Sequence, residues 1–308
     1  MRRWTVATGD ATMEGVPAAE VARYRALVIG TLPQFVGGSF TLISQTRHTL
    51  ALECDGWIFK FARSSEAEAR LRREVVLLQF LRPRITMTVP QIVMHEGPVP
   101  FSQHPRIPGS ALETADYLDL DEGRRNALAL RMAQLYAELH ALPLSRMQQV
   151  GAVGVDPWMA PDDIVAGARA KLPRGYKGYL DRTVAAYRKL SIAGPELVYG
   201  YFDGHGGNMA FDHETGRLNG VFDFADSGFG SRHRDLSCSN WVSADLTLRI
   251  IERYEELAGV EVDRDKVMLY SSALRLAELA GGSLPENRAI ANVTDWVVEL
   301  KAIGMFHG

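Results

Sequence analysis

The sequence predicts an α+β fold of two lobes, in which a small β-rich N-terminal lobe precedes a mainly α-helical C-terminal lobe. Strand patterns gather in the first third of the chain, and helical spacing dominates from Pro105 onward. The chain has 308 residues, 46% of them hydrophobic, which is enough for two lobes that share a cleft. We expect the N-terminal lobe to span residues 1–103 and the C-terminal lobe residues 104–308.

The N-terminal third shows two helical patterns and several short strand patterns. Apolar residues recur at helical spacing in 17–32, which predicts an opening helix. Asp55-Gly56 is typical of a hairpin turn, Ser64 or Ser65 can cap the second helix, and Pro83 ends it. The elements expected here are helices over 17–32 and 66–81 and strands over 40–44, 48–53, 57–61, 89–93 and 99–102.

The remainder of the chain is expected to be mostly helical. Apolar residues at helical spacing predict a long helix over 121–141. Further helices are expected within 169–190 and from 246 to the end. Short strands between 197 and 224 interrupt this pattern, and polar residues stand at or near their ends.

Charge and composition exclude several classes of protein. The net charge is −3, and Arg70, Arg72 and Arg73 alternate with glutamates, which indicates a solvated helix face rather than a nucleic-acid patch. Cys54 and Cys238 are far apart and have no CxxC or metal-ligand spacing, so we expect both to be reduced and unpaired. The sequence shows no secretory signal and no apolar stretch of membrane-spanning length. We therefore expect a cytoplasmic monomer or weak dimer with no nucleic-acid and no membrane partner.

Polar residues between 201 and 226 carry the clearest chemical signal. Asn208 follows Asp203 by five residues, and Asp223 begins an Asp-Phe-Ala sequence further along. Phosphoryl transfer to a hydroxyl needs a carboxylate that accepts the hydroxyl proton and oxygen ligands that hold Mg²⁺ against nucleotide phosphates. The D-x-x-x-x-N and D-F-G elements of kinases supply such groups at this spacing. Asp, Gly and Asn are also common turn residues, so a plain polar turn is the alternative.

Lys60 and Glu74 extend this set in the order that kinases use. Lys60 lies in an apolar strand pattern, where an ammonium group needs a partner, and Glu74 follows in the next predicted helix. In kinases such a lysine holds the phosphates of ATP or GTP and pairs with a helix glutamate. Taken singly, Lys60 fits a solvated edge-strand lysine and Glu74 a surface residue. The ordered set favours the kinase interpretation.

The chain resembles the aminoglycoside phosphotransferase family, relatives of choline and homoserine kinases with a protein-kinase-like fold. The family pattern is approximately His-Gly-Asp-Leu-His-x-x-Asn, followed by Ile-Asp-Trp/Phe-x-Asp-Ala. This chain has Tyr201-Phe202-Asp203-Gly204-His205-Gly-Gly-Asn208 and Phe222-Asp223-Phe224-Ala225-Asp226. Arg234-Asp235-Leu236 and Leu139-His140 match as well, so the resemblance covers about residues 40 to 240. The branch that phosphorylates the 2″-hydroxyl of gentamicin-like drugs looks closest.

This resemblance implies a two-lobed fold with a nucleotide cleft and a role for each residue. Asp203 would be the catalytic base, and Asn208 and Asp223 would hold Mg²⁺. Lys60 would bind the nucleotide phosphates and Glu74 would position it. The other residues expected to meet the nucleotide are Ser44 and Thr46 in the loop over the phosphates, and Phe101 and His104 in the linker 101–106, which would meet the base through its backbone.

Two features depart from the family pattern. Tyr201-Phe202 stands where the family has His-Gly, and the bulk of Phe202 predicts a different local backbone. The loop 44–48 contains no glycine, although glycine normally allows close approach to phosphate. Hydroxyls of Ser44 and Thr46, or Arg47, would compensate, and a plain hairpin turn is the alternative.

The expected acceptor is a hydroxyl of a small molecule, with an aminoglycoside antibiotic as the first guess. A polycationic drug needs acidic residues near the site, and candidates in the C-terminal helices are Glu255, Glu256, Glu261, Asp263 and Glu278. One alternative is a kinase of another small molecule, such as a sugar, an amino alcohol or a macrolide. The other is a nucleotide-binding protein without turnover.

Overall fold

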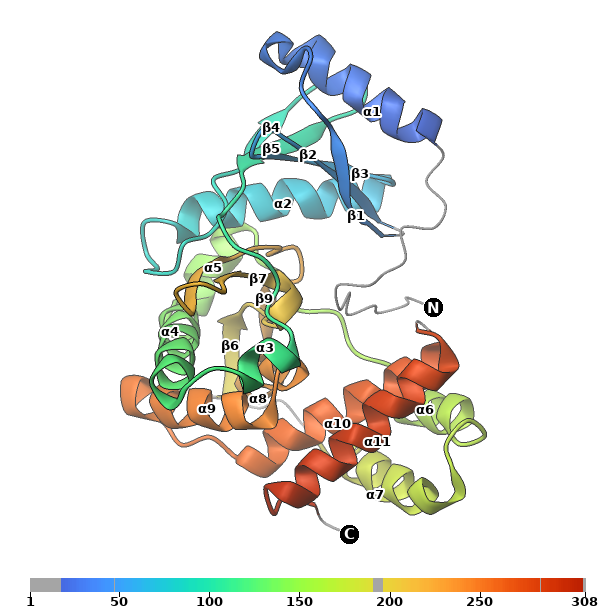
Figure 1. Cartoon of the computed structure of the whole chain (residues 1–308). Helices are drawn as coiled ribbons and strands as arrows, with labels where there is room; N and C mark the ends of the chain where they lie inside the picture. Colours follow the sequence, from blue (N-terminus) through green and yellow to red (C-terminus); the bar gives the residue numbers. More distant parts are fainter. Residues whose placement is uncertain (1–17, 47, 191–195, 283, 307–308) are drawn as a thin grey trace.

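Five antiparallel strands form the sheet of the N-terminal lobe (Figure 1). The computed structural model describes residues 18–46, 48–190, 196–282 and 284–306. Alternate side chains of the sheet, among them Leu50 and Phe59, are buried beneath helix α1 (Ala18–Thr31). Pro17, the first residue of the predicted opening helix, lies outside the described residues. In spatial order the strands are β1 (Thr41–Gln45), β2 (Thr49–Cys54), β3 (Trp57–Ala62), β5 (Phe101–Pro105) and β4 (Val93–His95).

Helix α2 (Ser65–Leu81) lies on the opposite face of the sheet from α1 (Figure 1). Ser64 is its cap, because the Ser64 hydroxyl accepts a backbone N–H of the first turn at 3.1 Å. The strand predicted over 89–93 is wrong, since only its last residue belongs to β4. Val89 and Ile92 are instead buried in the core that α2 shares with the second lobe, so this apolar run packs rather than pairs.

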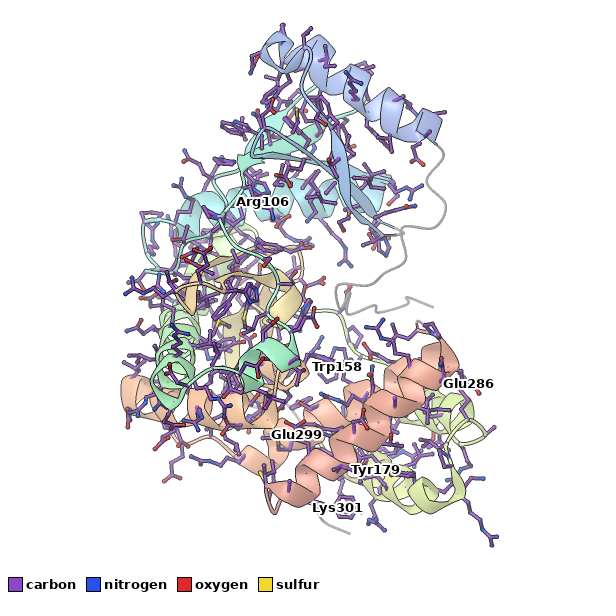
Figure 2. The ribbon with its side chains drawn as sticks, in the orientation of Figure 1. Arg106, Trp158, Tyr179, Glu286, Glu299 and Lys301 are labelled. Carbon is purple, nitrogen blue, oxygen red and sulfur yellow. The ribbon has the colours of Figure 1, made fainter. Side chains whose placement is uncertain are left out.

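The linker after β5 is hydrogen-bonded to both lobes. The backbone N–H of Arg106 donates to the carbonyl of Gly56 at 2.8 Å, and Figure 2 shows Arg106 just below the sheet. Ser110 and Phe211 then exchange two backbone hydrogen bonds, at 2.9 and 2.8 Å. These bonds attach the linker to the second lobe. The division predicted between residues 103 and 104 lies within β5 and stays a prediction.

The C-terminal lobe begins with a core of packed helices and two small antiparallel sheets. Helices α4 (Glu122–His140) and α9 (Ala244–Ala258) pack against each other, and Asp121 caps α4 by accepting an N–H at 2.8 Å. The helix predicted over 121–141 is therefore confirmed. The other α-helices and strands of this core are α3 (Thr114–Leu118), α5 (Leu144–Val150), α8 (Arg232–Leu236), the pair β6 (Leu197–Gly200) and β9 (Gly228–Ser231), and the pair β7 (Met209–Asp212) and β8 (Arg217–Val221).

A second group of helices lies beside this core, at the lower right of Figure 1. Its members are α6 (Pro161–Ala168), α7 (Lys177–Tyr187), α10 (Arg264–Gly281) and α11 (Glu286–Ala302), and they share an apolar cluster around the buried Trp296. Glu299 of α11 (Figure 2) accepts the N–H of Ala244 at 2.6 Å, which joins this group to α9. Within the described ranges, no helix is both long enough and apolar enough to cross a membrane.

Candidate active site

The loop between β6 and β7 holds Asp203 and Asn208 side by side. The Asn208 amide Nδ2 donates to Asp203 Oδ2 at 2.6 Å and to the Asp203 carbonyl at 3.0 Å. His205 Nε2 lies 3.4 Å from Asp203 Oδ1, and its Nδ1 accepts the N–H of Gly207 at 3.0 Å. With Nδ1 as an acceptor, the neutral ring carries its proton on Nε2, toward the carboxylate. These contacts hold the Asp203 side chain in place. The side chain is 25% exposed, so it is still open to an incoming group.

Lys60, Glu74 and Asp223 meet where the two lobes face each other. Lys60 Nζ lies 2.8 Å from Asp223 Oδ1 and 3.3 Å from Glu74 Oε2. Lys60 belongs to the central strand β3, and Glu74 is 2% exposed, so neither is the solvated residue of the alternative interpretation. Glu74 Oε1 also accepts the N–H of Phe224 at 2.8 Å. Three predicted residues from distant parts of the sequence are therefore in direct contact.

Burial and charge act against each other in this cluster. Burial lowers the pKa of Lys60, but Asp223 and Glu74 outweigh it and hold that pKa above its ordinary value. For Asp223 burial raises the pKa, but Lys60 outweighs it and the net pKa is lowered. For Glu74 the effect of burial outweighs that of Lys60, so the pKa of Glu74 is raised. Burial, together with the charges of Asp203 and Asp223, raises the pKa of Asp226 to about 7. Carboxylates outnumber ammonium groups here, which favours the arrival of a cation.

Asp235 braces the backbone that leads into the catalytic loop. Its carboxylate is fully buried and accepts the N–H of Tyr201 at 2.8 Å and that of Phe202 at 2.6 Å. His140 Nε2 lies 3.0 Å from the same carboxylate, so the Leu-His end of α4 contributes to this brace. Gly200 is required beside it, because a Cβ there would come within 2.0 Å of Asp235 Oδ2. The predicted structural role of Asp235 is confirmed.

Phe202 occupies a backbone conformation that normally belongs to glycine. Its φ is 60°, in the left-handed region, which a side chain other than that of glycine adopts only at a cost. Glycine, which the family pattern has at this position, adopts this conformation without that cost. The different local backbone predicted for Tyr201-Phe202 stays a prediction. The ring fills space left by Gly200 and Gly230, where built Cβ atoms would come within 2.9 and 2.6 Å of it.

A pair of substitutions at Phe202 should separate ring packing from backbone strain. Phe202→Ala removes the ring and keeps the strain, so we expect a loss of about 3–5 kcal/mol in the free energy of unfolding. Phe202→Gly removes both, and we expect it to be more stable than the alanine variant by about 1 kcal/mol. Urea unfolding of both variants measures the difference. An alanine variant as stable as the glycine variant would contradict a left-handed residue 202.

The residues predicted to meet the nucleotide base lie on two faces of the sheet. Lys60 pairs with Ser102 and Ile58 with His104 in the register of β3 and β5, so Lys60 and His104 share the face toward the second lobe. Burial, with a further contribution from Lys60, lowers the pKa of the His104 imidazole. The ring of Phe101 lies on the other face, 5.2 Å from that of Phe61, which leaves only its backbone for a nucleotide.

Ser44 and Thr46 lie at the β1–β2 turn. The Thr46 hydroxyl accepts the N–H of His48 at 3.1 Å and that of Thr49 at 3.0 Å, so it already stabilises the turn. Ser44 pairs with Ala51 next to a bulge in β1. Arg47, the third residue predicted to compensate for the missing glycine, lies outside the described residues. Contact of this turn with phosphate stays a prediction.

Asn208 and Asp223 fit the demands of a magnesium site. Both hydrogens on Asn208 Nδ2 face Asp203, which leaves the side-chain oxygen Oδ1 of Asn208 for a metal. The Asp223 side chain is 42% exposed, and only its Oδ1 contacts Lys60. The backbone N–H of Phe222 donates to the backbone carbonyl of Asn208 at 3.1 Å, which brings the segments that carry Asn208 and Asp223 together. Carboxylate and amide oxygens are the ligands that Mg²⁺ prefers.

The interpretation of Arg70 as part of a solvated helix face is wrong. Arg70 Nη1 lies 3.2 Å from Asp226 Oδ1, and its Nη2 lies 2.5 Å from Asp156 Oδ2. Asp226 is therefore paired with an arginine of the other lobe. The spacing of Arg70 and Glu74, one helical turn apart, was a signal that both face the second lobe.

Of the five predicted acceptor-site acids, Glu278 is the one whose charge acts on His205 of the catalytic loop. Its side chain is buried, and its charge adds to that of Asp203 in holding the pKa of His205 above its ordinary value, against the effect of burial. Glu255 and Glu256 instead pair with arginines on the surface, at 2.7 and 2.8 Å. Asp263 caps α10, and Glu261 is exposed.

Several solved structures share this fold. Aminoglycoside 2′-phosphotransferase-IIIa in complex with GDP aligns with a TM-score of 0.71 and 18% identity, covering 91% of this chain and 97% of that chain. The GDP and kanamycin complex of APH(2″)-IIia gives a TM-score of 0.66, with 19% identity and coverage of 91% and 97%. Macrolide 2′-phosphotransferase type I gives a TM-score of 0.60, with 16% identity and coverage of 92% and 99%. At such identities the likeness concerns the fold.

The curated proteins contain no match to this chain. A family model, however, matches residues 43–270, which include Lys60, Glu74, Asp203, Asn208 and Asp223. It describes the phosphotransferase enzyme family known as APH. The match spans most of the chain and both lobes, and it contains every residue of the cluster described above. The chain therefore belongs to the phosphotransferase enzyme family and is a nucleotide-dependent small-molecule kinase.

Proposed function

We propose that this kinase transfers the γ-phosphoryl group of ATP or GTP to a hydroxyl of a small molecule, with Asp203 as the base. The observation that carries the proposal is the contact of Lys60 with both Glu74 and Asp223, at 3.3 and 2.8 Å. The hydrogen-bonded Asp203–Asn208 pair stands beside this contact. Kinases use the same five residue types, in the same order, for phosphoryl transfer.

The chemistry assigns a role to each side chain. The Asp203 carboxylate accepts the acceptor's proton while the hydroxyl oxygen forms a bond to the γ-phosphorus. The bond from that phosphorus to the β,γ-bridging oxygen breaks, and the nucleoside diphosphate leaves. Asn208 and His205 orient the carboxylate through contacts at 2.6 and 3.4 Å. The Lys60 ammonium has three hydrogens and, among the residues that the structure describes, two partners, so one hydrogen is available for a phosphate oxygen.

Asn208 and Asp223 would hold Mg²⁺, which when bound neutralises charge on the phosphates. We place the nucleotide base against His104 and the backbone of residues 101–106, because His104 and Lys60 share one face of the sheet. Ser44 and Thr46 would approach the phosphates from the β1–β2 turn.

An aminoglycoside is the acceptor we propose first. The fold is similar to that of APH(2″)-IIia in complex with GDP and kanamycin, and the buried Glu278 contributes a negative charge that acts on His205. Arg275, one turn before Glu278 on α10, is also buried and partly balances that charge. A macrolide is the second candidate, because the fold is also similar to that of a macrolide 2′-phosphotransferase and a macrolide carries less positive charge.

An acceptor screen tests the proposal. Nucleotide consumption should be measured with Mg²⁺ and with ATP or GTP, over kanamycin, gentamicin, a macrolide, simple sugars and amino alcohols. We expect kanamycin or gentamicin to raise consumption above the rate without acceptor and to yield a product heavier by one phosphoryl group. Stimulation by a macrolide or sugar alone would overturn the aminoglycoside acceptor and leave the mechanism intact. If no acceptor and no slow hydrolysis consumed nucleotide, the mechanism would also fall.

A further inference from the structure

Two carboxylates of the C-terminal lobe converge on one arginine of the N-terminal lobe. Arg70 lies on α2, one turn before Glu74, and its two terminal nitrogens bind different partners. Nη1 donates to Asp226 at 3.2 Å and Nη2 to Asp156 at 2.5 Å, while Glu66, one turn earlier on α2, lies 3.7 Å away. The planar fork of arginine can serve two acids at once, which a lysine ammonium does less well.

Asp156 and Asp226 are both fixed to the body of the C-terminal lobe. Next to Asp156, the N–H of Val155 donates to the carbonyl of Phe229 in β9 at 3.0 Å. Asp226 lies in the turn that follows Asp223, and the same turn donates the N–H of Phe224 to Glu74 at 2.8 Å. Arg70 and Glu74 thus attach the same face of α2 to the other lobe at neighbouring points.

We propose that Arg70 is a positioning residue, which holds α2 against the C-terminal lobe so that Glu74 can orient Lys60. This inference rests on the phosphate-binding role proposed for Lys60. Glu74 reaches Lys60 only while α2 stays close to the Asp223 turn, because the same carboxylate binds Lys60 and the Phe224 N–H. Arg70 supplies the charged contact that keeps the helix there. The segment that carries Asp156 continues to Trp158 (Figure 2). The guanidinium carbon of Arg234 lies over the Trp158 ring, 4.4 Å from the ring centroid.

Arg70→Met keeps much of the side-chain length and removes the charge. We expect kcat/KM for the Mg-nucleotide, measured by acceptor-free hydrolysis or with an acceptor from the screen, to fall about 10-fold. The melting temperature should change by no more than about 3 °C, because partly exposed ion pairs contribute little to stability. Arg70→Lys should recover part of the activity, since one ammonium can still reach one carboxylate. Arg72→Met is the matched control. Within the part of the chain that the structure describes, Arg72 pairs with Glu68 and Glu96, both of its own lobe, so this variant should keep wild-type activity.

The decisive measurement repeats Arg70→Met in a Glu74→Gln background. If Arg70 acts through Glu74, the second substitution should add little to the loss caused by the first. The positioning role would be overturned if the losses of kcat/KM in Arg70→Met and Glu74→Gln were fully additive. It would also be overturned if Arg72→Met lowered kcat/KM as much as Arg70→Met. If Glu74→Gln itself left activity and Mg-nucleotide affinity unchanged, the proposed roles of Lys60 and Glu74 would fail instead. A loss in Glu74→Gln without a loss in Arg70→Met would contradict the inference about Arg70 alone.

Discussion

Asp203→Asn should lower kcat by a factor of about 10²–10⁴ and leave the affinity for Mg-nucleotide nearly unchanged. Asparagine has the shape of aspartate and can still accept the hydrogen bond from Asn208, which is 2.6 Å long in the wild type. It cannot take up the hydroxyl proton, so the change removes the base with little effect on the loop. The loss should appear in steady-state turnover with any acceptor found in the screen, and calorimetry should give a nucleotide dissociation constant within about twofold of the wild type.

Asp181→Asn provides the matched control for that substitution. Asp181 lies on α7, and about half of its side-chain surface is exposed. It forms an ion pair with Arg169, which is also exposed. We expect this variant to keep wild-type turnover and stability. Wild-type kcat in Asp203→Asn would exclude Asp203 as the base, whereas equal losses in both variants would indicate a nonspecific effect of the substitution.

Asp223→Ala should weaken Mg-nucleotide binding by about 100-fold or more, because it removes the only charged protein ligand proposed for the metal. It also removes the closer of the two carboxylates that hold Lys60, the one at 2.8 Å. Dissociation constants for the nucleotide should be compared with and without Mg²⁺ for the wild type and the variant. We expect Mg²⁺ to strengthen binding clearly in the wild type and only slightly in the variant.

The measurement without Mg²⁺ serves as the internal control for this variant. Binding in the presence of a chelator should not weaken, because Asp223 then only places a negative charge near the phosphates. A variant that kept the full effect of Mg²⁺ would show that the metal is held elsewhere. A variant that lost binding equally under both conditions would indicate damage to the site around Lys60 instead.

The two-lobed α+β fold could be predicted because its signals are local. The strands around 48–53 and 57–61, the Asp55-Gly56 turn and the cap at Ser64 each depend on a few neighbouring residues, and the structure confirms them. The strand predicted over 89–93 failed because a short apolar run looks the same whether it pairs in a sheet or packs in a core. Helix α6 (Pro161–Ala168) was not predicted, and it is only eight residues long.

The sequence alone singled out the residues to which we assign the chemistry. Asp203 and Asn208 share one tight loop, and Lys60, Glu74 and Asp223 stand in an order that few folds would produce by chance. Local spacing could single them out because each of these residues lies within, or close to the end of, an element that the sequence pattern predicts.

Only the tertiary structure decided what surrounds that set. The acids that bind Arg70 lie 86 and 156 residues away in sequence, and an arginine on a helix has the same local pattern whether it faces water or another lobe. In the sequence, Glu278 has the same local pattern as the exposed helix acids. In the structure, the packing of α10 buries it, and its charge acts on His205. Burial and long-range contact depend on how elements meet in space, and the periodicity of a single element does not contain that information.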